Sequence, residues 1–185
     1  LNGTLTCNAS DIDLGAGLSG NKFGLSANTS GIFNGGTGTH TIWALGMTGG
    51  TITLSSGITT LTGKNSSTSG NIYFYSGTFN HGSGTLVQNY ATQNCNSLFN
   101  MSITFNNFIL NAPTKDYQPY TYNKSLTIAH DGDLTITAGD YITKYTTHPD
   151  IELTVDGDVL ISDGGTLTGM ASTISFGSLT IAGGG

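Results

Sequence analysis

Acidic residues at two matching positions are the best candidates for chemistry in this chain of 185 residues. Asp131-Gly-Asp133 recurs further along the chain as Asp156-Gly-Asp158. Carboxylate oxygens suit Ca²⁺, and glycosidases place two carboxylates about 5 to 9.5 Å apart. Asp-Gly and Gly-Asp are also ordinary turn dipeptides whose side chains cap the local backbone. We expect turns at both places, keep these four aspartates as candidate Ca²⁺ ligands, and rank hydrolysis below both.

Other catalytic or metal-binding patterns are missing from the sequence. The four histidines lie far apart, and no serine occupies a Gly-x-Ser-x-Gly elbow. We therefore predict no enzymatic activity, no catalytic residue and no cofactor other than the Ca²⁺ considered above. The five basic residues are all lysines and the net charge is −6, which argues against nucleic acid as a partner. No apolar run approaches the ~20 residues that cross a bilayer.

Surface contacts are the other kind of site that the sequence offers. Tyr117, Tyr120 and Tyr122 occupy a stretch interrupted by proline, where exposed rings would contact a glycan or a partner protein, or else cover a neighbouring subunit. Asn-x-Ser/Thr sequons, which are candidate glycosylation sites, occur at Asn2, Asn8, Asn28, Asn65, Asn100 and Asn123.

The composition predicts the kind of element that must position these residues. Charged residues form only 9% of the chain, and there are 28 glycines. Thr, Ser and Asn make up about a third of it, while β-branched and aromatic residues are too frequent for a disordered chain. The chain is therefore predicted to be all-β. Cys7 and Cys95 are interpreted as small buried apolar residues rather than as a disulfide.

Internal repeats indicate how the strands are arranged. Gly24, Gly50 and Gly77 follow one another at spacings of 26 and 27, and a second glycine series keeps the same spacing at positions 31, 57 and 84. A unit of this length holds about three short strands and must stack on its neighbours to bury its apolar face. We predict a right-handed parallel β-helix of about seven coils, each of about 26–27 residues. An antiparallel β-sandwich is the alternative.

Short alternating runs within the repeats predict which side chains point inward. Leu126, Leu153 and Leu179 begin similar Leu-Thr-Ile or Leu-Thr-Val runs, and we expect them to stack in line, as should Ile128, Val155 and Ile181.

An interruption divides the repeats into two sets. Residues 111–124, with two of the three prolines, are expected to form an irregular loop between solenoid coils 1–110 and solenoid coils 125–185. Two units joined by this loop, or one continuous domain, are both compatible with the pattern.

The repeat sequences resemble those of a broad group of phage and bacterial surface proteins. The matching stretches include Phe105-Asn-Asn-Phe-Ile-Leu-Asn111 and Gly132-Asp-Leu-Thr-Ile-Thr-Ala-Gly139. Such proteins include tail-fibre and tailspike shafts and adhesins of the filamentous-haemagglutinin type. The resemblance implies a structural or adhesive solenoid of an extracellular fibre, a virion or a cell surface. A tailspike-type enzyme acting on carbohydrate and a self-assembling filament subunit are the alternatives.

Partners follow from the same interpretation. A solenoid leaves unpaired backbone groups at its end strands, which pair with another chain unless they are capped. We expect copies of the chain or other fibre subunits as partners, with a host-surface glycan as a further one. The chain begins at Leu1 without an initiator Met, and we interpret it as a processed or excised piece.

Overall fold

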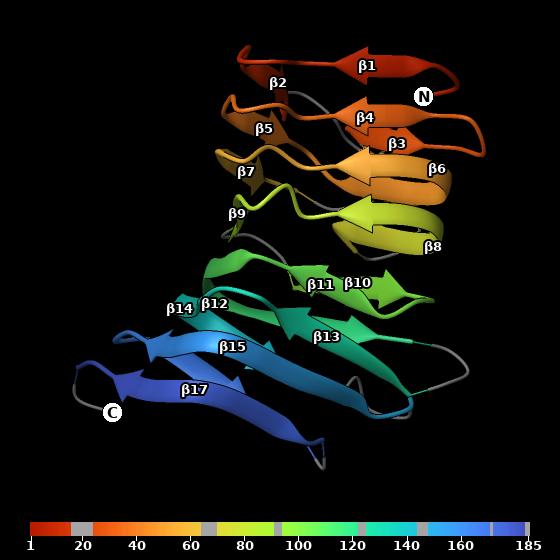
Figure 1. Ribbon diagram of the computed structural model, residues 1–185. Coiled ribbons are helices and arrows are strands. Elements are labelled where there is room, and N and C mark those ends of the chain that lie inside the picture. The colour runs from red at the N-terminus through yellow and green to blue at the C-terminus, as the bar shows by residue number, and fades with distance from the viewer. Residues whose placement is uncertain are drawn as a thin grey trace.

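The chain folds into a parallel β-solenoid, which confirms the predicted fold class. The computed structural model describes residues 1–15, 24–63, 70–90, 94–121, 125–143, 148–170 and 172–183. Its coils stack from the N-terminus at one end to the C-terminus at the other, in about six turns where about seven were predicted (Figure 1). Every strand pairing described is parallel, which excludes the antiparallel sandwich. The described residues include no helix long and apolar enough to cross a membrane.

Strands of the described residues form one continuous hydrogen-bonded sheet. In chain order they are β1 (Thr4–Thr6), β2 (Ile12–Leu14), β3 (Leu25–Ala27), β4 (Ile32–Asn34), β5 (His40–Ile42), β6 (Leu45–Thr53), β7 (Ile58–Leu61), β8 (Ile72–Asn80), β9 (Thr85–Asn89), β10 (Cys95–Phe99), β11 (Ile103–Phe105), β12 (Asn107–Tyr120), β13 (Leu126–His130), β14 (Leu134–Ile142), β15 (Ile151–Ile161), β16 (Gly165–Thr168) and β17 (Ile174–Ile181).

Each coil passes through three faces, and the long strands bend to contribute to two of them. Face A is formed by β3, β6, β8, β10, β12, β14 and β16. Face B is formed by β1, β4, β6 and β8, followed by β11, β13, β15 and β17. Face C is formed by β2, β5, β7, β9, β12, β14, β15 and β17.

The coils are less regular in length than the predicted repeat. The coil that runs from Ile32 to its partner Thr51 is shorter than that repeat, whereas the coil from Ile12 to its partner His40 is longer. Pairing is residue for residue within each face, and the differences in length fall at the turns and at the bends of the long strands, where the register shifts. The glycine series nevertheless brings successive turns together, because an added Cβ on Gly77 would lie 2.8 Å from the oxygen of Gly50.

Both predicted columns of aliphatic residues are wrong in register, although the strands that carry them are parallel. Ile128, rather than Leu126, pairs with Leu153 in face B, and Leu179 pairs with Val159 in face C. Ile128, Val155 and Ile181 likewise do not share one column. The reason is that one coil can contain two Leu-Thr-Ile runs, one in face B and one in face C. Similar sequences therefore do not identify equivalent positions in successive coils.

The predicted irregular loop is also wrong for residues 111–120, which lie in β12. The strand turns from face C to face A at Pro113 and Thr114, where the register with β14 shifts and Thr114 adopts a φ of 62°. Pro119 then pairs with Ser97 of β10. The prolines mark a corner and a strand position rather than an excursion. Residues 122–124 lie outside the described part.

Aromatic rings fill the middle of the solenoid. Phe74 of β8 packs against Phe99, Phe99 against Phe105, and Phe105 against Phe108, with ring centroids 5.4–6.3 Å apart. Phe108 continues the cluster to Tyr117, 5.3 Å away. These rings come from several coils, so their burial ties the coils together in addition to the backbone ladder.

The corners bring backbones of successive coils into direct contact. Gly36 adopts a φ of +65°, and a Cβ built on it would lie 1.7 Å from the oxygen of Asn8 in the preceding coil. Gly3, at another corner, has no heavy atom within 4 Å of such a Cβ. Only the first position requires glycine, both for its left-handed backbone and for the close approach.

We therefore expect Gly36→Ala to lower the free energy of unfolding by about 2 kcal/mol or more, since left-handed strain and the backbone clash add. Gly3→Ala is the matched control and should change it by less than about 0.5 kcal/mol. Urea denaturation followed by circular dichroism measures both. Equal effects of the two substitutions would contradict the close packing of the first coils.

Candidate functional site

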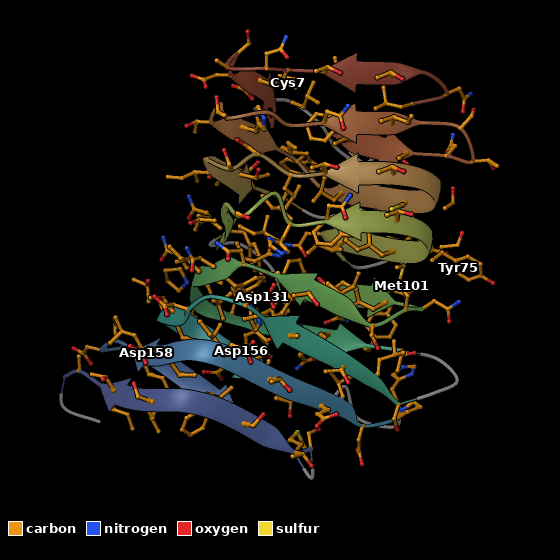
Figure 2. The ribbon with its side chains drawn as sticks, in the orientation of Figure 1. Cys7, Tyr75, Met101, Asp131, Asp156 and Asp158 are labelled. Carbon is orange, nitrogen blue, oxygen red and sulfur yellow. The ribbon has the colours of Figure 1, made fainter. Side chains whose placement is uncertain are left out.

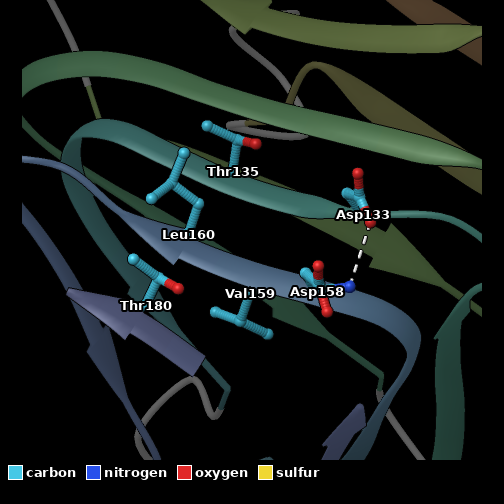
Figure 3. A pocket seen from close by; sticks show the side chains of 6 residues that line it. All are labelled: Asp133, Thr135, Asp158, Val159, Leu160 and Thr180. Carbon is cyan, nitrogen blue, oxygen red and sulfur yellow. Dashed lines mark hydrogen bonds between the residues drawn. The ribbon is translucent and has the colours of Figure 1, made fainter. Parts of the chain in front are cut away.

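Both Asp-Gly-Asp runs lie at the corner between faces B and C. The first forms the predicted turn between β13 and β14, whereas the second lies within β15, where the strand bends and the predicted turn is wrong. The Asn107 Oδ1 accepts a hydrogen bond from the Asp133 amide at 3.0 Å, and the Asp133 Oδ1 accepts one from the Asp158 amide at 2.9 Å (Figure 3). The Asp158 Oδ1 in turn accepts from the Ser178 hydroxyl at 2.6 Å. We call Asn107, Asp133, Asp158 and Ser178 the aspartate column. The expectation that these aspartates cap the local backbone is wrong for Asp133 and Asp158, because their Oδ1 atoms accept hydrogen bonds from the next coil.

The glycines of the two Asp-Gly-Asp runs make room for this column. A Cβ on Gly132 would lie 2.1 Å from the Asn107 Oδ1, and one on Gly157 would lie 2.4 Å from the Asp133 Oδ1. Glycine therefore lets each side-chain oxygen approach the next coil and reach its amide. The recurring Gly-Asp pair is explained by stacking of the corners.

A shallow hollow of about 220 Å³ lies beside the aspartate column on the outside of face C (Figure 3). Its lining consists of Asp133, Thr135, Asp158, Val159, Leu160 and Thr180. Thr135, Leu160 and Thr180 are register partners in three successive coils. Carboxylate and hydroxyl oxygens beside an apolar floor offer hydrogen bonds and contact area to a small polar molecule such as a sugar. No sequence motif predicts that Thr135 and Thr180 line the hollow, because only the strand register brings them together.

The other two candidate Ca²⁺ ligands have different surroundings. Asp131 faces His81, with 3.3 Å between the Oδ2 and the Nε2, and Asp156 is exposed (Figure 2). Among the residues that the structure describes, no three His, Cys, Asp or Glu side chains form a group that could hold a metal ion. The structure thus brings Asp133 and Asp158 together through a backbone amide and gives Asp131 another partner.

The interpretation of the tyrosines as exposed contacts is wrong for two of the three. Tyr117 is fully buried in the aromatic core and Tyr120 is 7% exposed, because β12 continues through them. Tyr122 lies outside the described residues. Tyr75 of β8 is instead an exposed tyrosine, pointing away from the solenoid beside the parallel ring of Tyr73 (Figure 2). Strand alternation around buried Phe74 predicts that orientation.

The sequons differ in exposure. Asn2, Asn8 and Asn28 are exposed, and Asn100 is partly buried. Asn65 and Asn123 fall in segments that the structure does not describe. The Asn28 Oδ1 accepts a hydrogen bond from the Thr48 hydroxyl at 3.2 Å, so this asparagine also belongs to a column between coils.

The two cysteines lie in different parts of the solenoid. Cys7 is buried with a free thiol, as expected for a small apolar residue. Cys95 lies in β10, where it pairs with Tyr117 of β12.

A column of buried polar side chains, which the sequence did not predict, lies inside the solenoid. The Ser97 hydroxyl donates to the Asn71 Oδ1 at 3.0 Å, and the Asn71 amide donates to the Gln88 Oε1. All three side chains are fully buried. The hydrogen bonds offset the cost of removing these groups from water. No period or motif distinguishes them from the outward asparagines.

Comparison with known proteins gives no further assignment. No protein family, curated protein or solved structure matches the chain. A functional conclusion therefore depends on the coils, the aspartate column and the hollow beside it.

The aspartate column predicts a specific pattern of stability changes. Asp133→Ala removes the acceptor of the Asp158 amide and should lower the free energy of unfolding by about 0.5–1 kcal/mol, since the site is exposed. Asp133→Asn keeps an acceptor oxygen and should have less than half that effect. Asp131→Ala is the control, because the exposed pair with His81 contributes little.

Urea denaturation of the three variants, with Ca²⁺ and with EDTA, makes the comparison. If the carboxylates act on backbone amides, Ca²⁺ leaves every midpoint unchanged. A rise in the wild-type midpoint with Ca²⁺ that is lost in Asp133→Asn would identify the column as a cation site instead.

Proposed function

We propose that the chain is a structural segment of an extracellular fibre or of a virion or cell-surface appendage. The observation that carries this proposal is the parallel ladder, which runs through all three faces and continues to β17 at one end of the stack (Figure 1). Such a ladder transmits load along its axis through backbone hydrogen bonds. A further coil extends the ladder through the same kind of hydrogen bonds.

The edge at β17 supports the proposal because it is open and apolar. Within the described residues β17 pairs with β15 alone. Leu179 and Ile181 point where the buried Val159 and Ile161 point in the preceding coil, yet they are 44% and 60% exposed. Apolar side chains in this position are stabilised when another coil covers them.

The same edge lacks the features that block strand addition. Charged side chains and prolines commonly guard edge strands. Residues 164–183 contain neither, so a further strand meets no like charge and no missing amide. We infer that another solenoid coil covers this edge; a copy of the chain, another fibre subunit or further residues of the same polypeptide can supply it.

An adhesive role of the outer surface belongs to the proposal. Two separate surface features support it: the hollow beside the aspartate column offers hydrogen-bond partners to a sugar, and on the other side of the solenoid the exposed ring of Tyr75 offers a stacking surface (Figure 2). We do not infer catalysis, because the Asp133 Oδ1 and the Asp158 Oδ1 already accept hydrogen bonds within the column. A general acid or base needs a carboxyl group positioned toward its substrate.

Association through the β17 edge is testable with one lysine. Residues 1–185 should show an average mass that rises with concentration in analytical ultracentrifugation. Ile181→Lys places a charge on the open edge and should weaken that association at least about tenfold, as gatekeeper charges do.

Ile58→Lys is the matched control, since Ile58 is a 45% exposed isoleucine in face C, away from the β17 edge. It should leave association unchanged. Concentration-independent monomers of the wild type, or equal losses in both variants, would contradict end-to-end assembly.

A further inference from the structure

His130 stands out among the buried polar residues of the core. It ends β13 and points inward between Phe105 of the preceding coil and Val155 of the next. Its ring centroid lies 5.7 Å from that of Phe105 at an interplanar angle of 28°, and 5.4 Å from that of Phe108 at 69°. The side chain is fully buried. An imidazole therefore occupies a position within a cluster of aromatic hydrocarbon rings.

Neither nitrogen of this ring has a hydrogen-bond partner within the described structure. The other fully buried histidine of the described residues, His40, differs, because its Nε2 lies 2.7 Å from the carbonyl oxygen of Gly35. A buried polar group without a partner is costly, and a buried charge without one is far more so.

Within the described residues, no charged group shares the core around His130. On β11, β12, β14 and β15, the titratable side chains of its core cluster are Tyr117 and Tyr141, both neutral in acid. Burial raises the pKa of Tyr141 further above its ordinary value. Tyr120, which ends β12, is also buried and contacts the ring of His148. The remaining titratable groups on these elements and the adjoining turn occupy partly or fully exposed positions: Lys115, Asp116, Asp131, Asp133, Asp140, Glu152, Asp156 and Asp158.

We propose that His130 is an acid-sensitive switch in the solenoid. Its ring accepts a proton only when the coils formed by β11, β13 and β15 separate around it, so acid favours the opened state. Opening would also expose Phe105 and Phe108, the rings that join these coils. This inference is independent of the proposed role in a fibre.

The pH range over which the switch acts follows from the pKa of the His130 ring in the closed and in the opened solenoid. Burial lowers the pKa of His130 from 6.5 to about 3 in the closed solenoid. Between these values the opened chain binds one more proton than the closed chain. The stabilisation by neutral His130 is thus complete above about pH 6.5 and is lost progressively as the pH falls toward about 3. At pH 4 the opening constant should be roughly 250-fold larger than at pH 7.5.

The test compares wild type with His130→Phe in urea denaturation from pH 7.5 to pH 4. Phenylalanine keeps an aromatic ring in the cluster and removes the proton site, so the roughly 250-fold change in the unfolding constant from this source should disappear. Carboxylates titrate in both proteins and cancel in the difference. His81→Gln, at a partly exposed turn, is the control and should retain the wild-type pH dependence.

Wild type and His130→Phe with parallel stability profiles would overturn the proposal. Nitrogen NMR of the wild-type histidines gives a second readout that needs no variant. The His130 ring should stay neutral in the folded protein down to about pH 4. A folded-state ring that becomes protonated near pH 6.5 would also overturn it.

Discussion

The parallel ladder between successive coils constrains every other feature of this protein. Each strand finds partners for its amides and carbonyls only in the coils on either side of it, so no coil is stable alone. The ladder also places a side chain directly over its counterpart, about 4.7–4.9 Å away. Columns of like charge would repel at that spacing. Some outward pairs are uncharged, as with Thr53 and Asn80. Where carboxylates stack, donors meet them: the Asp158 amide bonds to Asp133, and the Asn94 side-chain amide bonds to Asp116, which pairs with Asp140.

The same constraint explains where glycine and aromatic residues occur. Backbones meet at the corners, so Gly36 and Gly157 occupy positions where a Cβ would collide with the neighbouring coil. Turns and strand bends vary in length, while the pairing within each face stays in register. Inside, Phe105 contacts Phe79 of the preceding coil and His130 of the next, so such rings bury area that single short strands cannot. The proposed switch at His130 would make the stability of this cluster depend on pH.

The period and the composition were sufficient to predict the solenoid, but they did not predict the register of its strands. The Gly-Asp pairs located the corners that hold Asp133 and Asp158. The aliphatic columns predicted from the Leu-Thr-Ile runs were wrong, because one coil contains such runs in two different faces. Tyr117 was misplaced because proline was taken to end a strand that only turns a corner. The hollow and the buried Asn71 network depend on residues from several coils, whose alignment the sequence does not display.

Native-state hydrogen exchange of residues 1–185 tests the account most directly, because it reports the ladder amide by amide. If successive coils satisfy one another, protection is greatest in the central strands β8 to β14 and declines toward β1 and β17. Amides of neighbouring coils then open together. Uniform protection along the chain, or protection greatest in β17, would contradict a stack of coils held by a parallel ladder.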